Sequence, residues 1–288
     1  MKLNPRVDFA FKLIFEQHKD MLMSLINAVV SEKDQVQDIE VRNPYTQKMH
    51  MGSKFAVLDI KAQATNGTFY NIEVQVTDDL HYDKRSLYYW AKLYSEQLIS
   101  GDNYADLQKT VGIHILNFDL LDEPHYHNVF HVLNTKSQKK LSDMLEMHYI
   151  ELPKVPTDFQ YIQNTLDRWG AFLARAERYT KSTLPDALAS DPMIRKAMHV
   201  FETTLLEDDA LETYEARLKW LRDETSALET KYLRGLEEGK AAGLAEGEAK
   251  LAEEKRKAAA EKRDIARKLE ASGMDKNEIR QLTGLEAW

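Results

Sequence analysis

The sequence contains no cysteine, which excludes disulfide bonds and catalytic thiolates. It contains no apolar run of about 18 residues, and its first residues lack the apolar core of a signal peptide. We therefore expect a soluble cytoplasmic protein without a membrane partner. The chain also lacks a glycine-rich phosphate loop, a Gly-x-Ser-x-Gly nucleophile motif and zinc-ligand spacing.

The net charge of −8 counts against a protein that coats nucleic acid non-specifically, because such a protein needs a basic surface. A nuclease can still be acidic overall, since a bound metal ion offsets the carboxylates of its site. The charge therefore lowers the expectation of a nucleic-acid substrate without excluding it. The 288 residues, 43% of them apolar, are enough for one large core or two modest domains.

Two alternating segments joined by a short turn are the most informative part of the sequence. Residues 58–63 and 71–76 alternate polar and apolar side chains with period two, which is typical of half-buried strands. Between them, Thr65-Asn66-Gly67 suits a three-residue hairpin loop with its glycine in the left-handed conformation. The pattern predicts a β-hairpin.

With this loop, Asp59 lies directly opposite Glu73, and Gln75 shares their face of the sheet. Two opposed carboxylates repel each other unless a positive charge lies between them. A divalent cation is one answer, because Mg²⁺ and Ca²⁺ prefer oxygen ligands. Two alternatives stay open. In the first, this polar face of the hairpin is simply exposed to solvent, and Lys61 neutralises one of the carboxylates. In the second, a two-residue Asn66-Gly67 turn places the two carboxylates on opposite faces of the sheet.

Residues 1–156 are expected to form one mixed α/β domain. Apolar residues at helical spacing predict a helix over residues 8–30, with Asp8 as its N-cap. A second helix is predicted over residues 83–99, with Leu87 among its inward residues. Strands are predicted at residues 36–43, 55–64, 69–76, 111–118, 127–133 and 147–152.

The chain from residue 158 onward is expected to be helical. A helical domain over residues 157–221 contains predicted helices at 161–179, 193–205 and 210–221. Residues 222–271 balance acidic and basic side chains and are rich in Ala, Glu, Lys and Leu, which is typical of a long charged helix. With a short helical tail from Lys276, they form a third region, 222–288, expected to serve oligomerisation or regulation.

Glycines recur at every fourth residue of this long helix, at Gly235, Gly239, Gly243 and Gly247. Each one costs up to about 1 kcal/mol relative to alanine. Such a row makes a smooth strip that another backbone could approach closely. The alternative is a flexible, partly frayed segment between helices, and the composition does not distinguish this interpretation from a contact strip.

Two further groups of residues bear on chemistry. A His-x-His-x-x-x-His cluster begins at His125, and partly buried or surface histidines are a simpler interpretation of it than a metal site. The helix after the hairpin carries Arg85, Tyr89 and Lys92, a combination that can stack on bases and hold phosphates. We expect Tyr89 mainly to pack, and Arg85 and Lys92 to be the better candidates for nucleic-acid contacts.

The order helix, three strands, helix, strand, with an aspartate on the second strand and Glu-x-Gln on the third, resembles the core of the PD-(D/E)XK nucleases. More closely, the chain resembles the Rpn family of recombination-promoting nucleases, often labelled transposases, over nearly its whole length. The likeness is carried by Asp8-Phe9-Ala10-Phe11-Lys12-Leu13-Ile14-Phe15, Lys54 with Leu58-Asp59-Ile60, Asn71-Ile72-Glu73-Val74-Gln75, Arg85 with Tyr89-Trp90 and Tyr94, Leu141-Ser142-Asp143, His148-Tyr149-Ile150-Glu151-Leu152-Pro153-Lys154, the glycine row and Gly284.

The resemblance implies a divalent metal, Mg²⁺ or Ca²⁺, bound by Asp59, Glu73 and the Val74 carbonyl. Gln75 stands where the wider superfamily has a lysine, so it would act by hydrogen bonding and not by charge. Asp8 and Lys12 would line the site from the first helix.

Basic and aromatic side chains complete the site that the resemblance implies. Lys61 follows Asp59 by one pleat of the strand and is the candidate to substitute electrostatically for the missing lysine. Arg85 and Lys92 would hold phosphates of double-stranded DNA, with Tyr89 beside them.

The leading hypothesis is a metal-dependent DNA endonuclease linked to recombination or mobile elements, acting as a homodimer through its C-terminal helices. The rival is a catalytically weak or inactive nuclease-fold protein that acts through protein–protein interaction in regulation or defence. The acidic balance and Gln75 favour the rival, whereas the Asp59 and Glu73 pair favours the nuclease.

Overall fold

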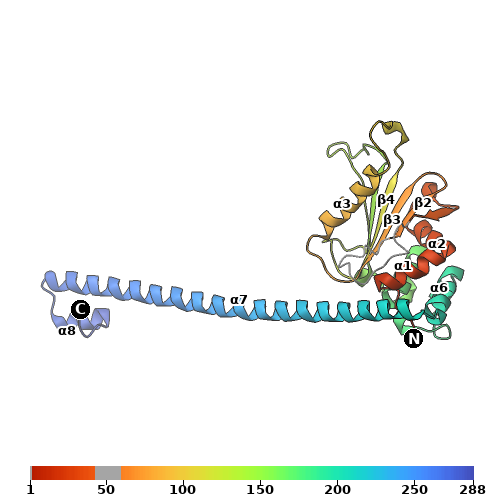
Figure 1. Cartoon of the computed structure of the whole chain (residues 1–288). Helices are drawn as coiled ribbons and strands as arrows, with labels where there is room; N and C mark the ends of the chain where they lie inside the picture. Colours follow the sequence, from red (N-terminus) through yellow and green to blue (C-terminus); the bar gives the residue numbers. More distant parts are fainter. Residues whose placement is uncertain (1, 43–59) are drawn as a thin grey trace. The chain divides into compact units, whose positions relative to one another are not determined.

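A computed structural model describes residues 2–42 and 60–288 (Figure 1). A six-stranded mixed sheet, in the order β1-β2-β3-β4-β6-β5, has helices on both faces. The strands are β1 (Ile39–Val41), β2 (Ile60–Ala64), β3 (Phe69–Gln75), β4 (Thr110–Leu116), β5 (His127–Phe130) and β6 (Leu145–Glu151).

The middle of the sheet is parallel and its two sides are antiparallel. β3 pairs with β4 and β4 with β6 in parallel, whereas β1, β2 and β5 join by antiparallel pairing. Helix α3 (Tyr82–Ser95) provides the crossover that the parallel β3–β4 pair needs. β4 is buried along its whole length, as expected of a strand covered on both faces.

Helices α1 (Asp8–Gln17) and α2 (Lys19–Val29) pack on one face of the sheet, and α3 covers the other (Figure 1). The single helix predicted over residues 8–30 is wrong, because the chain breaks at His18 between α1 and α2. The N-cap of α1 is Val7 and not Asp8. Leu87 of α3, predicted to point inward, is 50% exposed. The other helices of the first unit are α4 (Thr165–Arg175), α5 (Asp186–Ala189) and α6 (Pro192–Thr203).

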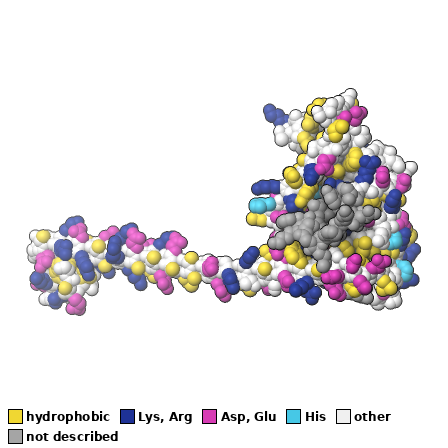
Figure 2. All heavy atoms as spheres, viewed as in Figure 1, with side chains coloured by type: hydrophobic (Ala, Val, Ile, Leu, Met, Phe, Trp, Pro, Cys, Tyr) yellow, Lys and Arg dark blue, Asp and Glu magenta, His cyan; other side chains and the backbone are white. Residues whose placement is uncertain are grey.

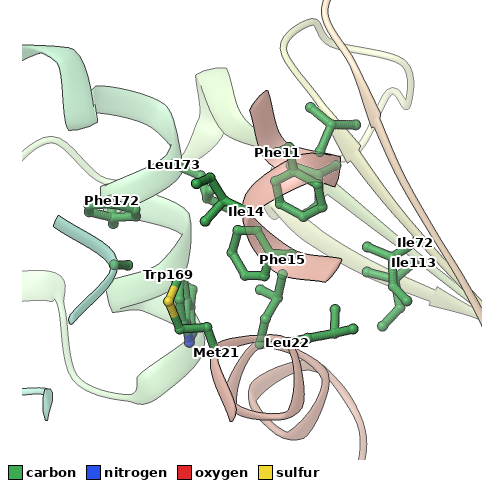
Figure 3. Packing of buried hydrophobic residues seen from close by; sticks show 14 of the residues in the cluster. Phe11, Ile14, Phe15, Met21, Leu22, Ile72, Ile113, Trp169, Phe172 and Leu173 are labelled. Atoms are coloured by element: carbon green, nitrogen blue, oxygen red, sulfur yellow. The ribbon is translucent and has the colours of Figure 1, made fainter. Parts of the chain in front are cut away.

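The main hydrophobic core lies between the sheet and these helices. Figure 3 shows Phe11 and Phe15 of α1 between the strand residues Ile72 and Ile113 on one side and Trp169 of α4 on the other. All five are fully buried, and the two phenylalanine rings stack with their centroids 4.3 Å apart. Truncating such an aromatic residue to alanine typically costs about 3–5 kcal/mol. This core fixes the sheet from one side and leaves its other face to the candidate site.

The chain divides into two compact units, Met1–Glu224 and Thr225–Trp288. Helix α7 (Asp208–Ala271) is continuous and contributes residues to both. Trp169, from the predicted helical domain, shares the main core with α1. The domain limits at residues 156 and 221 stay predictions.

In the second unit, α8 (Lys276–Thr283) packs against the end of α7. Ile279 of α8 and Ala266 of α7 are fully buried, and the left-handed Gly273 forms the turn between the helices. Basic and acidic side chains are interspersed along this unit (Figure 2). At each of the four glycines in the row, an added Cβ would meet no atom within 4 Å. Within residues 2–42 and 60–288, no helix combines the length and apolar character needed to cross a membrane.

Candidate active site

The hairpin of β2 and β3 has the register expected from a three-residue loop. Ile60 pairs with Ile72, and Gly67 has a φ of 91°, which is the left-handed conformation predicted for it. The alternative two-residue turn is thereby excluded. Asp59 lies outside the described residues, so its pairing with Glu73 stays a prediction that continues this register.

Arg85 of α3 binds Glu73 and Gln75, two polar residues on one face of β3. Its Nη2 donates to Glu73 Oε1 at 3.1 Å and to Gln75 Oε1 at 2.7 Å. Two oxygen atoms from alternate residues of one strand thus converge on one cationic nitrogen. Nη1 donates to Asp79 Oδ2 at 2.8 Å, and the guanidinium lies 4.7 Å from the centroid of the Tyr82 ring, a cation–π contact.

Two buried polar side chains also lie beside Glu73. His114 is the residue of β4 that pairs with Glu73, and its Nδ1 lies 3.9 Å from Glu73 Oε2. Tyr82 Oη lies 3.0 Å from the same Nδ1. Burial lowers the pKa of His114 to about 3. Burial, followed by the charge of Glu73, raises the pKa of Tyr82 well above its ordinary value, so both side chains are neutral near pH 7.

The sequence-based site did not include Tyr82, His114 or Asp79. A signal for His114 was present, because a histidine inside a continuously apolar strand must find a hydrogen-bond partner once it is buried. Asp79 carried no comparable signal, since it lies in the connection between β3 and α3. Its place beside Arg85 depends on how that connection folds.

Asp8 and Lys12 come from α1, which packs on the opposite face of the sheet from α3 (Figure 1). Asp8 is buried, and both of its carboxylate oxygens accept hydrogen bonds from Arg217 of α7. Lys12 is also buried, with its Nζ 3.8 Å from Glu16 Oε1. A catalytic role for Asp8 and Lys12 stays a prediction.

The other predicted contacts lie on α3 and on the hairpin. Lys92 is exposed and follows Arg85 by two helical turns, about 10 Å along the axis. Tyr89 is half-buried on the same helix. Lys61 is half-buried on the α3 face of β2, and the buried Val74 side chain points to the other face, which leaves only its backbone for a ligand.

The oxygen donors of β3 fit a hard divalent cation, because they already converge on a positive nitrogen. Among residues 2–42 and 60–288, no three histidine, aspartate or glutamate side chains are grouped as a metal site. Asp59 lies outside these residues, so the ligand set of Asp59, Glu73 and the Val74 carbonyl stays a prediction.

The histidines of residues 125–131 contribute to a second polar network. His127 Nε2 lies 2.9 Å from His148 Nδ1, and His148 Nε2 lies 2.8 Å from Glu146 Oε1. Lys109 Nζ donates to Glu146 Oε2 at 2.9 Å and lies 3.1 Å from Asp34 Oδ1. Burial lowers the pKa of His127 to about 4. This network links neutral and charged side chains into one chain of contacts.

These features define an α/β protein with a group of polar and charged side chains around Glu73 on one face of its sheet. A family model described as a PD-(D/E)XK nuclease family transposase matches residues 5–231, so the chain belongs to that family. The resemblance inferred from the sequence is confirmed. Comparison with curated proteins and with solved structures found no match. Membership points to nuclease or transposase-related activity on DNA, and PD-(D/E)XK nucleases generally use divalent metals.

Proposed function

We propose that the chain is a metal-dependent DNA endonuclease that hydrolyses phosphodiester bonds. The observation that supports this best is the convergence of Glu73 Oε1 and Gln75 Oε1 on one nitrogen of Arg85. The hairpin register adds Asp59 opposite Glu73 by extrapolation. A point that attracts a guanidinium attracts a doubly charged cation more strongly.

In this proposal Asp59, Glu73 and the Val74 carbonyl hold Mg²⁺ or Ca²⁺. A divalent ion supplies an activated water and offsets the charge of the scissile phosphate. Gln75 hydrogen-bonds and orients the attacking water, without the positive charge that a lysine would add.

Arg85 changes partners in this proposal. Its side chain is 30% exposed and is bonded to Asp79 as well as to Glu73. With a cation at Glu73, Arg85 keeps Asp79 and directs its released donor to a DNA phosphate. Lys92 and Lys61 contact neighbouring phosphates, and Tyr89 packs beside them.

The C-terminal helices are proposed to join two copies of the chain, which would suit cuts on both DNA strands. Large apolar side chains are exposed along α7 beyond residue 224, and they are Leu228, Tyr232, Leu233, Leu236, Leu244, Leu251 and Ile265. An exposed apolar series of this kind favours association. Sedimentation over a wide concentration range tests the homodimer, and a monomer at every concentration would contradict it.

A second candidate function is supported by the same arginine. Because Arg85 pairs with Glu73 at 3.1 Å, the carboxylate has a positive partner within the chain itself, as expected of an inactive protein that acts through protein–protein interaction. Calorimetric titration with Ca²⁺, with Asp59→Asn as control, separates the two functions. Metal binding lost in the variant supports the nuclease, and no binding by wild type supports the alternative.

The test of activity is the nicking of supercoiled plasmid in Mg²⁺, Ca²⁺ or EDTA, beside Asp59→Ala and Glu73→Ala. We expect metal-dependent nicking that both substitutions abolish. No cutting by the wild-type chain in any metal would favour the alternative function. A role in recombination or mobile elements and a cytoplasmic location stay predictions.

A further inference from the structure

We propose that an exposed ridge of α3, formed by Lys84, Tyr88 and Lys92, binds single-stranded DNA with an unpaired base stacked on the Tyr88 ring. This inference rests on the proposal that the chain acts on DNA, and it names the form of DNA that is bound. It assigns a ligand to an exposed aromatic side chain that neither the proposed site nor the hydrophobic core uses.

Helical spacing places the three residues of this ridge in one row. Lys84 and Lys92 lie four residues before and after Tyr88, so each is about 6 Å from it along the helix axis and about 40° from it around the axis. Both lysines are exposed. Asp83, the acidic residue of the first turn, lies about 140° from Tyr88 around the axis and therefore on another side of the helix. The ridge thus presents a positive charge on each side of one aromatic ring.

Tyr88 belongs to a group of large apolar side chains that are exposed at the start of α3. Tyr88 is 63% exposed, Leu87 is 50% exposed, and Leu80, just before the helix, is 86% exposed. A single exposed apolar residue is ordinary, whereas a group of them indicates a surface that binds a partner. The half-buried Tyr89 contacts the Tyr88 ring, with centroids 5.7 Å apart and an interplanar angle of 64°, and so restricts its motion. A ring held in this way loses little freedom when a base stacks on it.

The charges of the ridge favour a nucleic acid as its partner. Lys92 pairs with Glu96 at 3.7 Å, but both side chains are about half exposed, so solvent screens this pair and leaves the lysine available to a phosphate. Phosphates supply the negative charge that lysines attract, and bases supply flat rings that stack on a tyrosine. Only unpaired bases can stack there, because neighbouring bases cover both faces of a base inside a duplex. A single strand therefore matches both components of the ridge.

The ridge begins about one helical turn from the proposed active site. Arg85 precedes Tyr88 by three residues and lies about 60° from it around the helix axis. The same Arg85 donates to Glu73 Oε1 at 3.1 Å. A DNA strand with one base on Tyr88 thus brings a neighbouring phosphate to Arg85 and Glu73. This placement predicts that cleavage falls close to unpaired bases, as at a junction of single-stranded and duplex DNA.

Tyr161 provides a matched control outside α3. It is 60% exposed, close to the 63% of Tyr88. It has no lysine or arginine within four residues on either side, so it presents a similar ring without the flanking positive charges. Leucine at either position keeps an apolar side chain and removes the ring.

The experiment measures the binding of a labelled single strand, and of the same sequence as a blunt duplex, by fluorescence anisotropy in EDTA. We expect Tyr88→Leu to bind the single strand about 5- to 100-fold more weakly and to keep its duplex affinity within about twofold. Tyr88→Phe, which keeps the ring, and Tyr161→Leu should match the wild-type chain on both probes. Lys84→Met should weaken binding to both probes and lower the slope of affinity against salt by about 1. Melting temperatures establish that each variant is folded.

Three outcomes would overturn the ridge as a single-strand site. In the first, Tyr88→Leu and Tyr161→Leu have the same effect on single-strand binding. In the second, Tyr88→Leu weakens duplex binding as much as single-strand binding. In the third, Tyr88→Leu abolishes self-association and leaves DNA affinity unchanged, which would assign this surface to a second copy of the chain.

Cleavage is measured separately, in Mg²⁺ and in Ca²⁺, on a duplex that carries a single-stranded branch. We expect the wild-type chain to cut near the branch and Tyr88→Leu to lose this preference. A wild-type chain that binds the single strand in EDTA but cuts nothing in either metal would overturn the proposed nuclease activity and leave the ridge in place.

Discussion

Arg85→Met is expected to tighten metal binding at Glu73 and to weaken DNA cleavage, two effects of opposite sign. Methionine keeps an unbranched apolar stem like that of arginine, without its charge or donors. Arg85 binds the side-chain oxygens of Glu73 and Gln75, and a cation must break both bonds to take its place. Without Arg85, these oxygens accept the cation with no such competition.

The magnitude follows from the exposure of the pair. The side chains of Arg85 and Glu73 are 30% and 14% exposed, so solvent screens their attraction in part. A partly screened, charge-assisted contact contributes about 1–2 kcal/mol. Removing this competition should lower the metal Kd by about 5- to 30-fold. Losing a phosphate contact of similar strength should lower kcat/KM by a comparable factor.

Calorimetry with Ca²⁺ and nicking in Mg²⁺ measure the two effects separately. Lys92→Met is the matched control, because Lys92 is exposed and pairs with Glu96 at 3.7 Å instead of with the site. It should leave the metal Kd unchanged and weaken DNA binding slightly. An unchanged or higher metal Kd for Arg85→Met would refute the view that Arg85 occupies the place of the cation.

Three further substitutions test other parts of the structure. Because the folded-state pKa of His127 is lowered to about 4 from 6.5, the unfolded chain binds the extra proton between these values. His127 should make stability fall by about 1.4 kcal/mol per pH unit as the pH drops through this window, and His127→Gln should lessen the slope measured in urea titrations by that amount, leaving the similar contribution of His114. Asp8→Asn should lower the free energy of unfolding by about 1–3 kcal/mol, because it breaks the ion pair with Arg217. In an Arg217→Met background the same substitution should cost much less, and equal losses in both backgrounds would show that the ion pair contributes nothing to stability. Gly239→Ala should weaken the homodimer in sedimentation while favouring the helix by about 1 kcal/mol, and a tighter dimer would exclude the glycine row as a contact strip.

The parts of the fold that were predicted correctly are those that depend on local sequence patterns. Period-two alternation placed β3 at residues 69–76, against the observed Phe69–Gln75. Gly67 placed the turn between the two strands, because few other residues adopt its conformation, whereas the choice between a three-residue and a two-residue loop needed the observed register. Both signals depend only on neighbouring residues.

Contacts between distant segments could not be predicted in this way. Asp8 and Arg217 are 209 residues apart, and nothing near either residue indicates the other. Arg85 was predicted to contact nucleic acid, but its bond to Glu73 depends on how α3 packs on the sheet. The break at His18 likewise interrupts a continuous helical pattern, because α1 and α2 pack separately in the core.

The most direct test of the central claim counts Mn²⁺ bound to the wild-type chain and to Glu73→Gln by electron paramagnetic resonance. Mn²⁺ is a paramagnetic ion that accepts the same oxygen ligands as Mg²⁺. The proposed site predicts at least one bound ion in the wild-type chain and its loss in a folded Glu73→Gln variant. Equal binding by the two chains, or none by the wild type, would contradict a metal site at Glu73.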